Sequence, residues 1–524
     1  RYGDTITAGD GNNLVIGDNG RITAATEDGP NFSSLPMTLG LVETMESQVG
    51  GSDSITTGVG RDIILGGIGD DIIVANDGEY LPDAATGVQH GADANNVVLG
   101  DSGYIDWTAD DAGRTYADLT TPAGGSLPGD DRNAGDIDRV WSTEPGDGGA
   151  DRISTGDAHD IVLGGFGDDT VHAGHGKNIV FGDSGRITAA TTDDPDVQIS
   201  VTDFTIGEIA SIAFADGGAD TVDSGDQDDI IIGGRYDDAI DAGEGDNVVF
   251  GDHGRILMLT NMGFNTVVGE PARPPGDHPL TYALITSVVP VGELGGADTI
   301  TTGTGRDIIL GGAGADTIQA FASTSLGQME GSAGDDGNNI VFGDYGLVDY
   351  LSEELAQGGE ANPTLELYVL TNTADDAEAN PVRAADIDRI WSLADATALG
   401  GGDTITTGDS NDIILGGAGD DVVFAGNGSN FAMGDNGKLT AAATDMPATV
   451  YSVHEFTVCR VETIGFEDAD GGDDIITSGS GNDVLFGGAG DDTIYAGNGD
   501  DLAFGDQGLI QCVHQPFNPP VKIG

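Results

Sequence analysis

The sequence predicts an all-β fold: an elongated parallel β-roll whose coils are interrupted by inserted β-hairpins or small β-subdomains. Three observations lead to this fold. An acidic or amide residue recurs every nine residues, as at Asp403, Asp412, Asp421 and Asn430; glycines mark most of the turns; and three-residue runs centred on an aliphatic residue lie between them. Such runs fit brief β-strands joined by Gly-rich bends. Each nine-residue step is therefore predicted to be one turn and one strand, and two steps close one coil.

The nine-residue pattern forms six units, preceded by part of a unit. In chain order we predict a partial unit at 1–22 and full units at 50–105, 148–187, 217–256, 295–348, 400–439 and 471–510. Inserts occupy 106–147, 188–216, 257–294, 349–399 and 440–470, and a C-terminal tail occupies 511–524. Because the first two steps of the opening unit are missing, we expect the chain to be a piece of a longer one.

The turns carry the chemistry of a calcium site. Calcium takes six to eight oxygen ligands in irregular geometry, whereas magnesium demands a tight octahedron and holds its waters. A Gly-x-Gly-x-Asp turn supplies a carboxylate and, through its glycines, backbone carbonyls that can converge. Turns eighteen residues apart should stack, so that an ion lies between them; the alternative is that some of these aspartates only form turns. The candidate metal ligands are Asp53, Asp62, Asp71, Asp151, Asp160, Asp169, Asp220, Asp229, Asp238, Asp298, Asp307, Asp316, Asp403, Asp412, Asp421, Asp474, Asp483, Asp492 and Asp501.

The stretch from Gly416 to Phe424 matches, position by position, the repeat G-G-x-G-x-D-x-U-x, in which U is a large aliphatic residue. It resembles the RTX (repeats-in-toxin) family of hemolysin-type calcium-binding β-rolls. The resemblance implies a large extracellular repeat protein with multiple bound Ca²⁺ ions between successive turns. It also implies type I secretion, with folding once the chain leaves the low-calcium cytosol.

The composition narrows the setting. The 524 residues include 90 Asp plus Glu against 18 Lys plus Arg, a formal charge of −72. So acidic a chain repels itself when compact and needs cations or high salt to fold. Nucleic acid is disfavoured as a partner because no basic patch could neutralise phosphates. No apolar run is long enough for a transmembrane segment. Nothing shows whether Cys459 and Cys512 pair, and we favour free thiols.

The strand residues predict a covered sheet. Steps one and three of each unit should stack on one sheet, and steps two and four on the other. In steps two and four the central aliphatic residue is flanked by apolar residues on both sides, as in Ile161-Val162-Leu163. A sheet that is apolar on both faces is buried on both faces. We therefore predict that the inserts, or neighbouring subunits, cover this second sheet, and that residues such as Leu163, Phe250 and Phe342 are buried.

The inserts are predicted to leave and return on strands, for example Arg186–Thr188 and Val458–Ile464. Every unit closes with Gly-Asp-x-Gly, which we interpret as a terminator of the coil whose Asp is a candidate closing ligand. One such turn, Gly182-Asp183-Ser184-Gly185, looks like the nucleophile turn of a serine protease. Its sister turns replace the Ser, as Asn436 does, so we expect no enzyme activity.

A longer repeat points to a structural role. The sequence DIDRVWS at 136–142 returns as DIDRIWS at 386–392, so the chain reads as two copies of a three-unit array. We predict a non-catalytic, secreted structural protein at the cell surface: a matrix fibre, adhesin stalk, or filament or S-layer subunit that self-associates. A surface or polysaccharide ligand is left open. The alternative is a calcium-dependent export and folding module of a secreted toxin or hydrolase.

Overall fold

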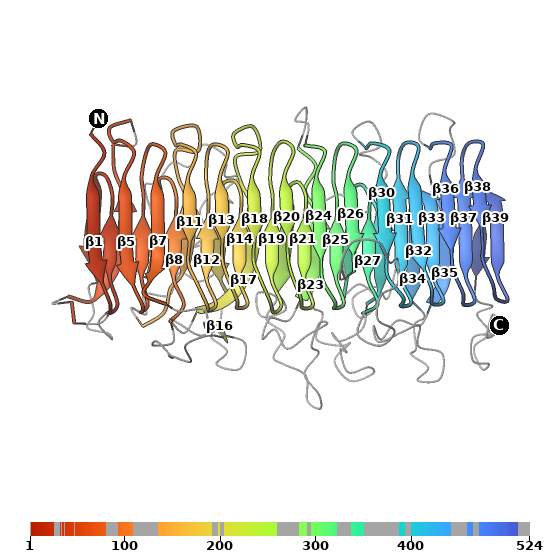
Figure 1. The fold of residues 1–524 in the computed structure, drawn as a ribbon, viewed down its shortest axis with the longest axis horizontal. Coiled ribbons are helices and arrows are strands. Elements are labelled where there is room, and N and C mark those ends of the chain that lie inside the picture. Colours follow the sequence, from red (N-terminus) through yellow and green to blue (C-terminus); the bar gives the residue numbers. More distant parts are fainter. Residues whose placement is uncertain are drawn as a thin grey trace, which may run out of the picture.

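The computed structural model describes residues 2–25, 32, 34–35, 37–46, 48–79, 93–107, 135–190, 198–199, 204–258, 282–290, 295–321, 337–350, 387–393, 400–441, 458–464 and 471–511. The regular elements of this part are all β-strands, and none of it forms a helix of the length and apolar character needed to cross a membrane. The strands stack along one axis into a rod whose N- and C-terminal ends lie at opposite ends of the long axis (Figure 1).

Two parallel sheets run the length of the rod, each with 13 strands in chain order. Sheet A contains β1 (Thr5–Gly9), β5 (Ser54–Gly58), β7 (Ile72–Asp77), β11 (Arg152–Ser154), β13 (Thr170–His172), β18 (Thr221–Asp223), β20 (Ala239–Asp241), β24 (Thr299–Thr302), β26 (Thr317–Ala320), β30 (Thr404–Thr407), β32 (Val422–Gly426), β36 (Ile475–Ser478) and β38 (Thr493–Tyr495). Sheet B contains β2 (Leu14–Ile16), β6 (Ile63–Leu65), β8 (Val97–Leu99), β12 (Ile161–Leu163), β14 (Ile179–Phe181), β19 (Ile230–Ile232), β21 (Val248–Phe250), β25 (Ile308–Leu310), β27 (Ile340–Phe342), β31 (Ile413–Gly417), β33 (Phe431–Asp435), β37 (Val484–Gly488) and β39 (Leu502–Asp506).

Steps one and three of every unit lie in sheet A, and steps two and four lie in sheet B, as the nine-residue period predicts. Strands one coil apart pair in register, for example Ile161 with Ile179. The central aliphatic residues of the two sheets meet in a narrow core that includes Ile55, Ile64 and Val162. This β-roll confirms the predicted fold class.

The coil does not stop at the end of a unit, which corrects our interpretation of Gly-Asp-x-Gly as a terminator. The third-step strand β7 pairs in parallel with β11, the first strand of the next unit, and β13 pairs in the same way with β18. Asp101, in the closing turn of the first full unit, explains how the coil continues. Its Oδ1 accepts a hydrogen bond from the N–H of Gly149, where the chain returns, and its Oδ2 accepts one from Phe166 in the following coil.

The other closing turns repeat this arrangement. Asp183 accepts hydrogen bonds from the N–H groups of Gly218 and Arg235, and the equivalent aspartates Asp18, Asp252, Asp344 and Asp435 each accept two such bonds. Both carboxylate oxygens are thus occupied by backbone donors. The closing Asp is a staple between an outgoing coil and the next one, and we no longer assign it as a closing ligand.

The strands of the inserts form a third, antiparallel sheet. Sheet C contains β3 (Gly20–Ala24), β4 (Leu39–Thr44), β9 (Gly103–Asp106), β10 (Arg139–Ser142), β15 (Gly185–Ala189), β17 (Phe204–Ser211), β22 (Gly254–Met258), β23 (Tyr282–Ser287), β28 (Gly346–Asp349), β29 (Arg389–Ser392), β34 (Gly437–Ala441), β35 (Val458–Thr463) and β40 (Leu509–Gln511), with β16 (Gln198–Ile199) paired to β17. Consecutive hairpins pair edge to edge, so the predicted hairpins join into one sheet in the described part of the chain. The remainder of the inserts and the tail from 512 onward lie outside the described residues.

Sheet C covers sheet B, and this confirms the predicted cover. Leu163, Phe250 and Phe342 are each 1 % exposed and belong to a second core that also contains sheet C residues such as Ile187 and Ile256. Fully burying an aliphatic or aromatic side chain stabilises a fold by about 1.5–3 kcal/mol. The chain's own inserts therefore provide the cover, with no need for a neighbouring subunit.

The cysteine prediction is wrong. Cys459 on β35 is disulfide-bonded, and Cys512, the only other cysteine of the sequence, lies outside the described residues. The last two strands of sheet C pair Arg460 with Gln511 in antiparallel register. Cys459 therefore lies on the strand that pairs with the last described strand of sheet C. The sequence alone did not reveal the disulfide, because no local pattern encodes the pairing of these two strands.

Candidate metal-binding turns

One column of aspartates follows the edge of the rod where the chain turns into sheet A. Each member is the residue immediately before a strand of that sheet, so the strand stacking places them one above another. The column consists of Asp4, Asp53, Asp71, Asp151, Asp169, Asp220, Asp238, Asp298, Asp316, Asp403, Asp421, Asp474 and Asp492. Every turn on this edge thus contributes an Asp, and we call it the Asp edge.

The Asp edge is ordered by a hydrogen-bond ladder. Asp53 Oδ1 accepts the backbone N–H of Asp4 at 2.6 Å, and Asp71 Oδ1 accepts that of Asp53 at 2.6 Å. The same bond recurs at each step, including between the Asp71 N–H and Asp151 Oδ1 at 2.7 Å, across an insert. Because Oδ1 is held by the preceding turn, the direction of each carboxylate is fixed before any ion binds.

The second oxygen of each of these carboxylates is left over. Oδ2 is buried and has no hydrogen-bond partner in the described part of the chain at Asp53, Asp71, Asp151, Asp169, Asp220, Asp238, Asp298, Asp316, Asp403, Asp421, Asp474 and Asp492. A buried polar atom without a partner costs about 1–3 kcal/mol, and more when it is charged. Twelve such atoms in one row therefore call for a ligand.

The glycines of these turns show what lies beside each spare oxygen. A Cβ placed on Gly66 would be closer than 3.0 Å to both Asp71 Oδ2 and the carbonyl oxygen of Gly100 in the next coil. The equivalent position at Gly164 faces Asp169 Oδ2 and the carbonyl of Gly182 in the same way. Only glycine leaves room for this convergence of a carboxylate oxygen with a carbonyl oxygen.

Burial also sets the charge state of the column. Desolvation raises the pKa of Asp71 to about 7. At Asp316 desolvation and the neighbouring Asp403 carboxylate raise the pKa to about 10, and at Asp403 desolvation and nearby carboxylates have the same effect. Opposite charge nearby would favour the ionised form. A bound divalent cation is therefore the natural way to keep this row ionised at neutral pH.

A second column lies on the opposite edge, where the chain turns into sheet B, and we call this the mixed edge. Its members alternate between Asp and Asn until the last unit: Asn13, Asp62, Asn96, Asp160, Asn178, Asp229, Asn247, Asp307, Asn339, Asp412, Asn430, Asp483 and Asp501. They form a ladder of the same kind; Asn96 Oδ1 accepts the Asp62 N–H at 2.9 Å, and Asp160 Oδ1 accepts the Asn96 N–H at 2.6 Å. The predicted ligands therefore divide between two separate edges.

The donor set fits calcium. No group of three or more His, Cys, Asp or Glu side chains converges on one point in the described residues. An ion in these turns would combine one or two carboxylates with backbone carbonyls, which is a ligand set that calcium accepts and that zinc and magnesium do not favour. The aspartates of the Asp edge would hold it, as would Asp62, Asp160 and Asp229 of the mixed edge, whose buried Oδ2 atoms also have no hydrogen-bond partner in the described residues. The ion would supply the positive charge that these rows lack.

The fold and these turns define a calcium-binding β-roll. A family model described as the RTX calcium-binding nonapeptide repeat, in four copies, matches the chain at residues 1–21, 49–80, 154–186, 223–255, 294–320, 397–432 and 468–503. The chain belongs to the RTX calcium-binding repeat proteins, whose repeats are typical of secreted proteins. A search of curated proteins found no match.

Proposed function

We propose that this chain is a non-catalytic, extracellular structural rod that calcium stiffens, serving as a matrix fibre, adhesin stalk, or filament or S-layer subunit. The observation that carries the proposal is the unbroken stacking of the coil across the five inserts. Each sheet continues from one unit to the next, as β7 does with β11, so the whole length transmits force as one body. A repeat array of this kind can be lengthened by duplication without a change of design.

Sheet C supports a mechanical role. A bare β-roll is narrow, with one core layer between two sheets. Here the inserts add a third layer and a second core along the described length of the rod. Bending such a rod would have to disturb both cores, which are packed against a common sheet B. A module needed only to assist export would gain little from this extra layer.

Calcium titration tests the proposal. Chelator-treated protein is titrated with calcium while circular dichroism follows the β-structure and small-angle X-ray scattering follows the particle shape, with magnesium as the control cation. We expect calcium, and not magnesium, to produce an elongated particle. A chain whose shape ignores calcium would contradict the proposal.

Self-association is part of the same proposal. Sedimentation of the calcium-loaded protein over a range of concentrations measures it directly. We expect the rods to assemble into fibres or arrays as the concentration rises. A discrete monomer at every concentration would favour the alternative, a folding and export module of a secreted toxin or hydrolase. Binding of a polysaccharide would be examined with the same calcium-loaded sample.

A further inference from the structure

The outer face of sheet A is the open face of the rod. Sheet B lies between two cores, whereas sheet A contacts a core on its inner side alone in the described part of the chain. In each of its strands the residues directly before and after the central aliphatic residue point outward, and every one of them is exposed or half-buried. A third layer thus covers one side of the coil, and the other side is open to a partner.

This face carries almost none of the chain's charge. Two outward positions in each of the 13 strands make 26, and the charged residues among them are Arg152, Asp223 and Asp241. Their formal charge is −1, from one Arg and two Asp, against −72 for the whole chain. Copies of so acidic a chain repel each other when they approach. The outer face of sheet A is therefore a side on which two copies can meet with little repulsion.

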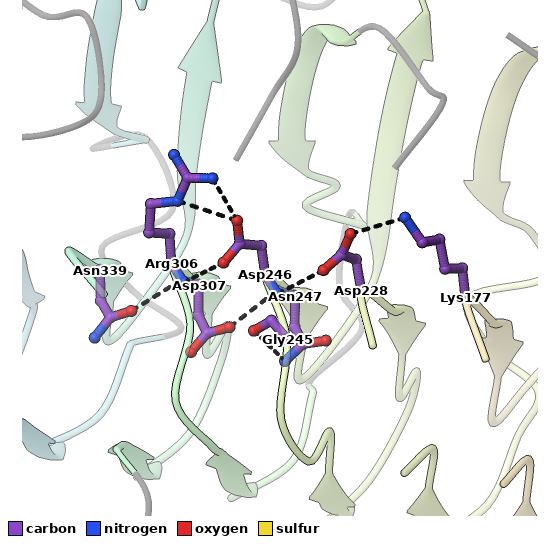
Figure 2. Close-up of polar contacts among 8 residues, drawn as sticks. All are labelled: Lys177, Asp228, Gly245, Asp246, Asn247, Arg306, Asp307 and Asn339. Atoms are coloured by element: carbon purple, nitrogen blue, oxygen red, sulfur yellow. Dashed lines mark hydrogen bonds and ion pairs between the residues drawn. The ribbon is translucent and has the colours of Figure 1, made fainter. Parts of the chain in front are cut away.

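The charge of the rod is concentrated in the turns beside this face. At the mixed edge even the basic residues are paired with acidic ones: Lys177 Nζ lies 3.2 Å from Asp228 Oδ2, and Arg306 lies 2.6 Å from Asp246 Oδ2 (Figure 2). Calcium bound in the turns, as in the proposed function, lowers the repulsion that remains between the edges of two copies.

Exposed apolar side chains stand in two groups on the outer face of sheet A. Ile72 on β7 is 47 % exposed, and Phe424, Ile475 and Tyr495 on β32, β36 and β38 are 37, 42 and 60 % exposed. β7 is the third strand from the N-terminal end of sheet A, and β32, β36 and β38 are the last three strands at the other end. Such groups on an open face are typical of a protein–protein contact.

We propose that the outer face of sheet A binds the same face of a second copy of this chain, with the two rods running in opposite directions. A two-fold axis parallel to the strands relates the copies, so the first strands of one rod lie opposite the last strands of the other. β7 lies opposite β36, β5 opposite β38 and β11 opposite β32. The proposal identifies the contact behind the self-association in the proposed function, and it rests on that function.

The apolar groups of the two copies meet in this arrangement. Ile72 of one copy faces Ile475 of the other, because both occupy the first outward position of their strands. Arg152 of one copy comes to lie beside Phe424 of the other, where a guanidinium group can stack on the ring. The two-fold axis repeats both contacts, so the same pairs close the two ends of the dimer.

The charged residues also fit this arrangement. β18 lies opposite β26 and β20 opposite β24, so Asp223 faces Gln319 of the other copy and Asp241 faces Thr301. Both facing side chains can donate a hydrogen bond to a carboxylate. Rods running in the same direction would instead place β18 opposite β18 and β20 opposite β20, which gathers four carboxylates in one place. The distribution of charge therefore favours the inverted pair.

The contact is large enough for a specific dimer. Twelve of the 13 strands of each copy take part, because only β1 has no strand opposite. Strands about 4.8 Å apart, each with three residues on the flat part, give a face of about 60 by 10 Å. Counted on both copies this is roughly 1,200 Å², the lower limit of specific protein–protein interfaces.

A matched pair of variants tests the contact. Ile72 on the outer face and Val49, in the segment before β5, are 47 and 48 % exposed. Sedimentation of the calcium-loaded full chain measures the dimer. We expect Ile72→Lys to weaken dimerisation by at least about tenfold, because it buries an unpaired charge against Ile475 at both ends of the dimer, and Val49→Lys to leave dimerisation unchanged. Equal dimerisation of the two variants would overturn the proposal.

Chemical cross-linking tests the direction of the rods. Cys459 is disulfide-bonded, so a cysteine introduced by Ile72→Cys or Ile475→Cys supplies the reactive thiol. A bismaleimide with a reach of about 10 Å spans two facing sheets. We expect a mixture of the two variants to form cross-linked dimers and Ile72→Cys alone to form none, since the two copies of position 72 lie about 43 Å apart in the inverted pair. Cross-linking of Ile72→Cys alone would overturn the inverted arrangement.

These measurements separate the contact from the proposed function. Fibres or arrays that form with Ile72→Lys as readily as with the unmodified chain would overturn this contact and leave the structural role intact. A monomer at every concentration of the unmodified, calcium-loaded chain would overturn the self-association of the proposed function as well.

Discussion

The staple formed by Asp101 leads to a prediction that can be worked out from its two hydrogen bonds. In Asp101→Ala the N–H groups of Gly149 and Phe166 lose a buried acceptor. A hydrogen bond to a charged group contributes about 1.5–3 kcal/mol, so the two bonds set an upper limit of roughly 3–6 kcal/mol. Burial raises the pKa of Asp101 well above its usual range, which shows that ionising this carboxyl has a cost that offsets part of the gain. We expect a net local loss of roughly 3 kcal/mol.

Hydrogen exchange of the calcium-loaded protein measures this loss where it occurs. In a solenoid each unit contacts only its neighbours, so the effect should be confined to the junction between the first two full units. A loss of roughly 3 kcal/mol corresponds to about a hundredfold faster exchange of the amides at positions 149 and 166. The equivalent junction at Asp252 is an internal reference, and Asp77→Ala, at an exposed position, is the control variant.

Two results would refute the staple. Unchanged exchange at both amides would mean that the carboxylate does not hold the returning chain. A loss of bound calcium in Asp101→Ala, with exchange otherwise normal, would mean that Asp101 is a ligand after all. We expect the calcium content to stay the same, because backbone donors already occupy both oxygens of this side chain.

Three further predictions concern the metal-free fold, the last unit and one strained turn. Without calcium, the chain should be more stable at about pH 5 than at about pH 8. Burial raises the pKa of Asp71 to about 7 and that of Asp316 to about 10, so between these two pH values the folded chain binds more protons than the unfolded chain and loses stability as the pH rises. Urea unfolding should therefore show the higher midpoint at pH 5, and equal midpoints would contradict the burial argument. Cys459→Ser should destabilise the last unit by up to roughly 4 kcal/mol, since the disulfide closes a loop of about 50 residues. Hydrogen exchange over the described residues between 458 and 511 would measure this loss of stability, and unchanged protection would refute the prediction. Tyr236 has a φ of 74°, at a turn position that Gly69 and Gly167 occupy in other units. Tyr236→Gly should therefore relieve about 1 kcal/mol of backbone strain and raise the melting temperature. A lower melting temperature would show that the contact between the Tyr236 ring and Arg235 stabilises the fold by more than the strain costs.

Much of the rod could be predicted from local sequence, because the information in a β-roll repeats every nine residues. The assignment of steps one and three to sheet A and steps two and four to sheet B follows from the period and from the apolar flanks of residues such as Val162. The burial of Leu163 and Phe250 followed from the same flanks, since apolar residues on both faces of a strand need a cover on both. The acidic turns could be recognised for the same reason.

The tertiary structure decided what no local period encodes. Sheet C joins hairpins such as β9–β10 and β15–β17 through pairing between segments far apart in the chain, and that pairing also places Cys459 beside the following strand. Asp101 bonds to the chain where it returns after an insert, so the sequence of its turn alone suggested that the coil ends there. The sequence by itself determined the repeat, its two sheets and its chemistry; long-range pairing determined the cover, the staples and which oxygens remain free, because these depend on residues that meet only across coils.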